Sequence, residues 1–455
     1  MGEKQAIPGK KRKLKISHIL LLMLLTGAVI FTLYRLSLKM KLRARIEAIR
    51  AASYPATLYE LDQWYSIPDT SENAADIILD SFDYYNEPAD KELPPWIGGA
   101  ELPARTESLP DDMRTIISNY LSSNQKSIEL LHEAASLEYS RYPVDFTLGA
   151  GTRIDHLVNL RQSLILLQLE AVYSAENGKQ EASIQSIKSI FGIARSLNKE
   201  PTTVSQLARL TYESRAVKTL ECVINKTDFS DEQLDELSQA FVNAQVLSNP
   251  GIWRAFAGER CMAMTFFAEP RTLTREIIGR KTLPAPILEL YKASGLADKD
   301  AIAYLDLMES YININKLPLH ERRTAAERIS SKRKTTSKIH VILRTFVPSF
   351  SGVINCDLRT IAGLRNAQVA LAIQRYRLAK SELPDQLKDL IPDYLSSIPL
   401  DPYDGKELRY KKLERGFVVY SIGEDLSDNG GTEIPQTSKE KRKIRNWDIT
   451  FVVEK

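Results

Sequence analysis

Residues 16–36 read ISHILLLMLLTGAVIFTLYRL, and this stretch carries one formal charge, Arg35, near its end. As an α-helix that rises about 1.5 Å per residue, about 21 residues cover roughly 30 Å, the thickness of the hydrocarbon core of a bilayer. The apolar run continues from Val29 to Leu33, beyond the small residues around Gly27 where a signal peptidase could cut. A cleaved signal peptide has a shorter apolar segment, so residues 16–36 predict an uncleaved transmembrane helix.

Basic residues lie on both sides of this apolar stretch, so the positive-inside rule is close to a tie. Before it stand Lys10, Lys11, Arg12, Lys13 and Lys15, and at its end and after it stand Arg35, Lys39, Lys41, Arg43 and Arg45. A short basic tail, residues 1–15, that stays in the cytoplasm is the simpler insertion. We therefore expect a single-pass protein of the inner (cytoplasmic) membrane, with the rest of the chain on the extracytoplasmic side.

The composition of the 455 residues is ordinary for a globular protein, with 43% hydrophobic and 26% charged residues. A chain of this length predicts two or three domains. The net charge of +3 is smaller than the basic surplus of the N-terminal region, so the remainder is nearly neutral and nucleic acid is not an expected partner. Cys222, Cys261 and Cys356 form no CxxC pair. We interpret them as small buried side chains, with a disulfide or a reactive thiol as alternatives.

Residues 37–350 repeat apolar side chains at helical spacing, which predicts a helical domain. Two such stripes are Ile184, Ile187, Phe191, Ala194 and Leu197, and Leu234, Leu237, Phe241 and Ala244. Ser230, with Gln233 three residues later, predicts a capping box at the start of the second helix. Further helices are expected at about 111–139, 152–176, 203–225 and 299–317.

Residues 171–182, AVYSAENGKQEA, resemble the turn between the two helices of a tetratricopeptide unit. Gly178 would end the first helix, and the small Ala182 would let the second helix pack closely. No convincing second copy follows at the family's spacing of about 34 residues. One repeat-like unit and an ordinary helical hairpin both fit, and the hairpin is the simpler interpretation.

The sequence contains no recognisable catalytic motif. Its five histidines have no cysteine or carboxylate at a known metal-ligand spacing; they are His18, His132, His156, His320 and His340. It contains neither a Gly-rich phosphate loop nor a GxSxG elbow. We therefore do not expect an enzyme. An enzyme of unknown type is kept as an alternative, and its sign would be a catalytic cluster assembled across helices.

The pattern changes in residues 355–455, which predict a small α+β domain. A helix over about 358–379 ends before Leu383-Pro384, because the residue that precedes a proline is disfavoured in the helical conformation. Residues 408–413 and 417–422 read as two strands, and the loop between them is short enough for a hairpin. Residues 448–453 complete an antiparallel sheet as a third strand.

Residues 392–405 read PDYLSSIPLDPYDG, and residues 420–431 read YSIGEDLSDNGG. Preceded by a helix and Leu383-Pro384, and separated by the hairpin, these segments resemble the globular head of the major pseudopilin of type II secretion. The resemblance covers about a fifth of the chain. It implies a pseudopilin-like head in which a helix is followed by an antiparallel sheet, and a calcium loop that ends in glycines.

The calcium site can also be argued from the loop itself. Asp425, Asp428 and Asn429 supply three side-chain oxygen donors close together in the sequence, and Ca²⁺ binds about six to eight oxygens at once. Gly430-Gly431 allows the tight turn that would bring backbone carbonyls inward. The sequence therefore predicts a Ca²⁺ site at Asp425, Asp428 and Asn429, with a plain polar turn as the alternative.

Two features depart from the pseudopilin pattern. The family begins with a prepilin peptidase site, whereas here Gly9 is followed by lysine, and Gly27 lies inside the apolar stretch without the glutamate that follows the cut. In the family the membrane helix continues directly into the head, whereas here about 300 residues separate the two. We therefore do not expect this chain to enter a pilus-like fibre by the family's route.

Together these features predict a membrane-anchored protein of the cell envelope with a structural or protein-interaction role, linked to a type II secretion or pilus-like assembly. Its partners would be the membrane and unidentified envelope proteins. The alternative is a helical-repeat adaptor in which the C-terminal head is only a structural cap.

Overall fold

The computed structural model describes residues 16–88, 94–98, 100–248, 251–270, 284–334, 350–434 and 446–455, and these are mainly helical. The α-helices are α1 (Ile16–Ala51), α2 (Leu58–Trp64), α3 (Ala74–Asp83), α4 (Asp111–Ser123), α5 (Gln125–Ser136), α6 (His156–Glu176), α7 (Gln180–Ser196), α8 (Thr203–Ile224), α9 (Asp231–Ser248), α10 (Gly251–Ala268), α12 (Ala285–Ser294), α13 (Leu296–Asn313), α14 (Leu319–Lys334) and α16 (Phe350–Lys380). Short 3-10 helices are η1 (Phe146–Gly151), η4 (Ile314–Lys316) and η5 (Leu387–Leu390), and the strands are β1 (Arg409–Lys412), β2 (Phe417–Ser421) and β3 (Ile449–Val453). The predicted tail, residues 1–15, lies outside the described residues.

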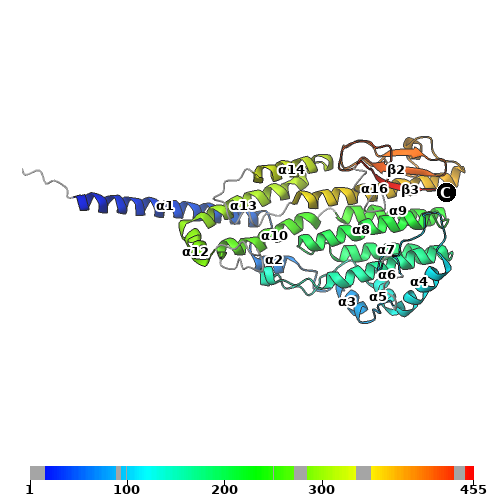
Figure 1. Ribbon diagram of the computed structural model, residues 1–455, viewed down its shortest axis with the longest axis horizontal. Coiled ribbons are helices and arrows are strands. Elements are labelled where there is room, and N and C mark those ends of the chain that lie inside the picture. The colour runs from blue at the N-terminus through cyan, green and yellow to red at the C-terminus, as the bar shows by residue number, and fades with distance from the viewer. Residues whose placement is uncertain are drawn as a thin grey trace, which may run out of the picture.

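α1 is a continuous helix of 36 residues that projects from one end of the body (Figure 1). Every residue from 16 to 34 is exposed, so the body does not bury the apolar half of this helix. The second half packs on α13: Leu38 is buried, and Arg35 Nη2 lies 3.2 Å from Asp298 Oδ2. Among the described residues, α1 is the helix that is long and apolar enough to cross a membrane, a character that signal sequences share.

The helices predicted in the middle of the chain are present, with one difference. The capping box of α9 is confirmed, because Gln233 N donates to Ser230 Oγ (3.3 Å) and Ser230 N donates to Gln233 Oε1 (3.0 Å). The run predicted at 111–139 is instead two helices, α4 and α5, which meet at Asn124. The buried Asn124 amide donates to Tyr120 O (2.9 Å), and a side chain that bonds the backbone in this way competes with helix continuation.

α6 and α7 form the predicted helical hairpin. It turns at Gly178, whose φ of +66° lies in the left-handed region that favours glycine. The two helices are tied together where Ser183 Oγ donates to Ala171 O (2.9 Å). At Gly192 an added Cβ would lie 2.5 Å from Ala135 Cβ, so α7 also packs very closely against α5.

α16 joins the helical body to the C-terminal sheet. Its first part belongs to a core that it shares with α10, α13 and α14. Its second part packs on α8 and α9 and also on β2 and β3 (Figure 1). Every residue from 366 to 374 is buried, so this part of α16 is covered on all sides. One core therefore contains residues from both sides of the boundary predicted at 350–355.

The three strands form an antiparallel sheet in the order β1-β2-β3. Lys412 of β1 lies opposite Phe417 of β2 at the predicted hairpin, and Ser421 of β2 lies opposite Ile449 of β3. Gly416 turns the hairpin with a φ of +73°, and a Cβ there would lie only 1.8 Å from a backbone oxygen of β3, so the turn needs glycine. The small antiparallel sheet predicted near the C-terminus is confirmed.

Candidate functional sites

The C-terminal strand is fastened to the helical body along its outer edge. β3 lies at the edge of the sheet, and side chains from the last turn of α8 and from Asn225, the residue that follows it, bond the backbone groups that face away from β2. Val452 N donates to Glu221 Oε1 (2.8 Å), while Asn225 donates to Val452 O (2.9 Å) and accepts from Glu454 N (2.7 Å). These side chains satisfy an edge that would otherwise be open to pairing with another strand.

Ion pairs around Arg105 also connect the C-terminal segment to the helical body. The guanidinium lies 2.5 Å from Glu433 Oε2, 3.2 Å from Glu454 Oε1 and 3.8 Å from Glu221 Oε1. Burial acts to lower the pKa of Arg105, but the hydrogen bond to Glu433 and the charges of the neighbouring carboxylates outweigh it, so the pKa is raised. The sheet and the helical body are therefore joined by polar as well as apolar contacts.

The structure places the predicted calcium ligands in the segment that follows β2. Asp425 Oδ2 accepts from Asn429 Nδ2 (3.0 Å), so these two side chains lie together. Asp428 Oδ1 accepts from Tyr420 OH (3.1 Å), and its Oδ2 lies 3.4 Å from Arg409 Nε. Asp428 thus bonds side chains of the sheet, whereas Asp425 and Asn429 bond each other.

Asp448 is a further carboxylate at this loop, at a position that the sequence predicts only as the start of a strand. It is completely buried and accepts from Asn429 N (3.3 Å) and Gly431 N (2.8 Å). Burial raises the pKa of Asp448 against the opposing effect of these two donors. The described part of the chain does not gather three His, Cys, Asp or Glu side chains into a metal cage.

Two histidine–glutamate pairs join residues that lie far apart in the sequence, and no local residue spacing predicts them. In the first, His156 Nε2 lies 3.0 Å from Glu200 Oε2, and Ser205 Oγ donates to Glu200 Oε1 (2.5 Å). The Tyr142 ring stacks on the His156 ring with 4.0 Å between centroids. Because the carboxylate stands between the histidine and the serine, His156 cannot act as the base for Ser205. Glu200 is completely buried, so this cluster ties α6 to the turn before α8.

The second pair has the order of a catalytic triad. His132 Nε2 lies 3.0 Å from Glu170 Oε2, and His132 Nδ1 lies 2.8 Å from Ser189 Oγ. Such rows activate a serine nucleophile in hydrolases. Ser189, however, is completely buried in the middle of α7, where the neighbouring N–H groups are used by the helix and cannot form an oxyanion hole. In this conformation the contacts of His132 with Glu170 and Ser189 hold α5, α6 and α7 together, and the Ser189 hydroxyl is not accessible to a substrate.

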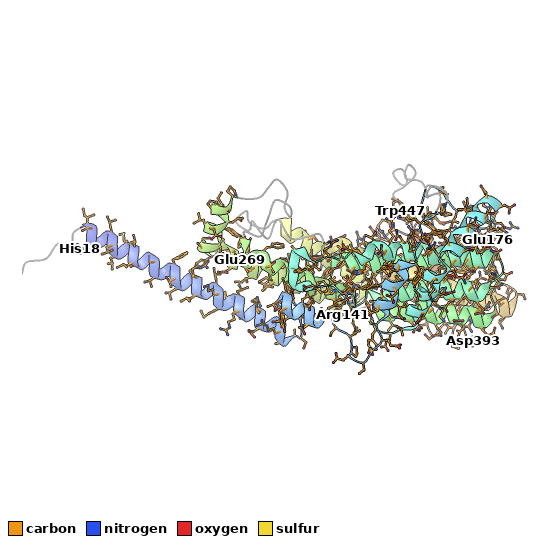
Figure 2. All side chains as sticks on the ribbon, turned by 90° about the horizontal axis from the view of Figure 1, so that it is seen from below. His18, Arg141, Glu176, Glu269, Asp393 and Trp447 are labelled. Atoms are coloured by element: carbon orange, nitrogen blue, oxygen red, sulfur yellow. The ribbon has the colours of Figure 1, made fainter. Side chains whose placement is uncertain are left out.

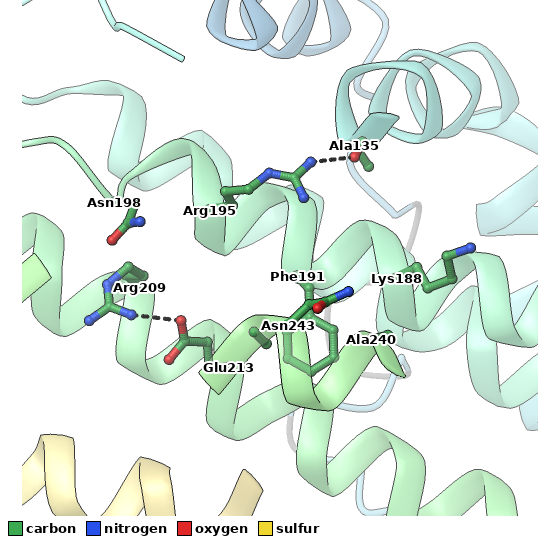
Figure 3. A pocket seen from close by; sticks show the side chains of 10 residues that line it. Ala135, Lys188, Phe191, Arg195, Asn198, Arg209, Glu213, Ala240 and Asn243 are labelled. Atoms are coloured by element: carbon green, nitrogen blue, oxygen red, sulfur yellow. Dashed lines mark hydrogen bonds and ion pairs between the residues drawn. The ribbon is translucent and has the colours of Figure 1, made fainter. Parts of the chain in front are cut away.

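A cavity of about 170 Å³ lies between α5, α7, α8 and α9 (Figure 3). Arg209 in its wall donates from Nη1 to Glu213 Oε1 (2.6 Å). Arg195 donates to two carbonyls at the end of α5 (2.5 and 2.8 Å), and Lys188 Nζ lies 2.6 Å from Glu236 Oε1. Each of these three cationic side chains therefore has a protein partner, while Arg209 Nη2 is buried without a hydrogen bond.

The cysteines are all free thiols. Burial raises the pKa of Cys222 to about 11 and that of Cys261 to about 12, so both stay protonated near neutral pH. Cys261 is buried, and Cys222 and Cys356 are half-buried. The interpretation of the cysteines as small packed side chains fits this arrangement.

Comparison of the chain with protein-family models, with curated proteins and with solved structures gives no match in any of the three. The resemblance of residues 383–431 to pseudopilin heads therefore rests on the sequence motif itself. A function for the chain has to be argued from that motif and from the geometry described above.

Proposed function

We propose that the chain is a single-pass protein of the inner membrane, anchored by residues 16–36 of α1, with its body on the extracytoplasmic side. The observation that carries this proposal is the surroundings of α1. Residues 16–34 are apolar apart from a few small or neutral polar side chains, and all of them are exposed. In water this exposure would cost about 25 cal/mol per Å² of apolar surface, whereas lipid tails would cover it. Extraction of native membranes with alkaline carbonate tests the anchor, because a spanning helix resists it.

We further propose that the body has a structural or protein-interaction role rather than an enzymatic one, beside a type II secretion or pilus-like assembly. The support is the order of elements in the C-terminal region, where α16 is followed by the proline-bearing turn, the hairpin and β3, as in the motif of pseudopilin heads. Because β3 is bonded to α8, the opposite edge of the sheet, β1, is the one left for a partner.

Co-purification of the intact protein from its native membrane identifies the partner, and matched charge reversals locate its binding surface. Deletion of the head is unsuitable for this purpose, because the loss of α16 would expose the core residues of α8 and α9 on which it packs. Lys411→Glu on β1 and Lys126→Glu on α5 each change one exposed lysine. Loss of the partner with Lys411→Glu but not with Lys126→Glu supports a binding head. The reverse pattern supports the helical-repeat adaptor with the head as a cap.

Calcium is the cofactor that the head would take, held by Asp425, Asp428 and Asn429, in a loop whose backbone N–H groups at Asn429 and Gly431 donate to Asp448. If it binds, the melting temperature of the whole chain should be higher with calcium than with chelator. A ligand that binds only the folded state raises the free energy of unfolding by about 2.7 kcal/mol at a hundredfold excess over Kd. Magnesium should add much less, because it requires a smaller octahedral shell and loses water reluctantly.

The calcium effect should depend on the loop carboxylates. Asp425→Ala together with Asp428→Ala should abolish the difference between calcium and chelator. Asp385→Ala removes a carboxylate from an exposed residue elsewhere in the head and should leave the difference intact. Equal melting temperatures of the unaltered chain in calcium and in chelator would make the loop a plain polar turn.

A further inference from the structure

α12 has an outward face without polar side chains. From residue 284 to residue 294, the residues that are exposed are all apolar: Pro284, Ala285, Pro286, Ile287, Leu290 and Ala293. Ile287 is 48% exposed and Leu290 is 69% exposed. The other side of the helix packs on the body through Leu288 and Tyr291, which are buried. A helix on a water-facing surface normally turns its charged and polar residues outward, whereas the most exposed residues of α12 are apolar and its charged residues, Glu289 and Lys292, are only partly exposed.

α12 is fixed to α1 at the point where the predicted membrane span ends. Arg35 Nη1 donates to Lys292 O (2.9 Å) at the end of α12, and Arg35 Nη2 lies 3.2 Å from Asp298 Oδ2 in α13. The contact is close, since a Cβ added at Gly295 would lie 2.6 Å from Arg35 Nη1. Arg35 is one residue from the end of the predicted span, so the bilayer surface would lie at the level of this contact.

The whole helix lies at that end of the molecule. α12 is next to the point where α1 leaves the body, far from the C-terminal sheet (Figure 1). Lys292 of α12 pairs with Glu269 (2.8 Å), and Glu269 is labelled at the same end in a second view (Figure 2). Both views therefore place α12 at the end of the body from which α1 emerges.

We propose that α12 is an interfacial helix whose apolar face rests in the surface of the bilayer that α1 crosses. The inference rests on the proposed membrane anchor and adds a second contact between the protein and the membrane. Interfacial helices of this kind bury apolar side chains at the boundary of headgroups and acyl chains. Contacts with the membrane at both α1 and α12 fix the tilt of the body relative to the bilayer, whereas α1 alone would let this tilt vary.

The test uses the full chain in vesicles of phosphatidylcholine and phosphatidylglycerol, with single spin labels on introduced cysteines. The native cysteines are first replaced by alanine, and the replacement is accepted only if the melting temperature is retained. Leu290→Cys reports on α12, Leu25→Cys on the anchor, and Leu378→Cys on an exposed leucine in the last turn of α16 (51% exposed). Oxygen is concentrated in lipid and a nickel chelate in water, so the ratio of accessibilities to the two reagents gives the position of each label.

The expected result is a ratio at Leu290→Cys that is severalfold higher than at Leu378→Cys and is shifted toward the value at Leu25→Cys. A water-like ratio at Leu290→Cys with a lipid-like ratio at Leu25→Cys would overturn this inference and leave the anchor intact. A water-like ratio at Leu25→Cys would overturn the anchor itself. Protection of Leu290→Cys from both reagents would mean that protein, a second copy or another chain, covers α12, and it would also overturn the inference.

Discussion

α1 spans 36 residues and α16 spans 31, yet the two helices have opposite surroundings. Residues 16–34 of α1 are exposed throughout, whereas residues 366–374 of α16 are buried throughout. Their polar side chains differ in the same way. Thr32 Oγ1 in α1 donates to Ala28 O of its own helix (2.8 Å), while Asn366 Nδ2 in α16 donates across to Ile449 O of β3 (2.6 Å).

This difference separates a helix suited to lipid from a helix suited to a protein core. In a bilayer no neighbour or water satisfies a polar group, so a spanning helix has to be apolar and to bond its polar groups internally. Inside a protein a helix can carry polar side chains, provided that each finds a partner on an adjacent element. Substitutions in the two helices test this difference in surroundings.

The largest effect is expected from charges in the apolar half of α1. Each lysine near the middle of a spanning helix costs about 2.5–3.5 kcal/mol of insertion free energy, so Leu21→Lys with Leu25→Lys should cost about 5–7 kcal/mol. The double variant should leave the membrane fraction on carbonate washing. Leu378→Lys adds a charge to an exposed position of α16 and should stay in the membranes. Full retention of the double variant would show that α1 does not cross the bilayer.

The next largest effect, on the free energy of unfolding, is expected when a leucine side chain is truncated to alanine in α16 but not when it is truncated in α1. Leu371 of α16 is completely buried, and Leu→Ala at such a site lowers the free energy of unfolding by about 2–5 kcal/mol. Leu25→Ala removes an identical side chain that touches no core and should leave the unfolding of the body unchanged. The measurement is denaturant unfolding of both variants in the same detergent. Equal destabilisation by the two substitutions would contradict the surroundings assigned to them.

A smaller effect concerns the buried charge of α16. Burial raises the pKa of Asp357 to about 6, while the charges of Arg209 and Arg322 act in the opposite direction. Its pKa in the unfolded chain is about 3.9. Folding therefore favours the protonated acid, so the stability that Asp357 contributes is complete below about pH 4 and is lost as the pH rises through about 6.

Asp357→Asn should remove this pH dependence. One unit of pKa shift corresponds to about 1.4 kcal/mol. When the pH rises from 4 to 7.5, the free energy of unfolding of the variant should therefore increase by about 1–3 kcal/mol relative to that of the unaltered chain. Thermal melts of both proteins at the two pH values measure the gain. If the melting temperature of Asp357→Asn differs from that of the unaltered chain by the same amount at both pH values, the carboxyl group does not titrate in this range.

Local sequence signals predicted the elements well. The capping box at Ser230, the hairpin turn at Gly416 and the positions of the three strands follow from residue types within a few positions of each other, and the structure has them. The break at Asn124 was missed because it depends on a side chain that bonds backbone groups. The burial of α16 on several sides was missed because α8 and α9 lie more than a hundred residues away in the sequence.

The candidate site was predictable only in part for the same reason. Asp425, Asp428 and Asn429 were identified from one short loop, whereas Asp448 reaches that loop only because β3 pairs with β2. The His132–Glu170 pair depends on the packing of α5 on α6, which local residue spacing does not encode. Long-range packing therefore decides which polar groups meet, and local pattern decides which helices and strands exist.

Whether α1 is an uncleaved membrane anchor can be measured as the mass of the protein in carbonate-washed native membranes. An uncleaved anchor gives a membrane-retained chain that still contains the basic tail of residues 1–15. A soluble mature form that begins near Val29 would show instead that residues 16–28 belong to a cleaved signal peptide.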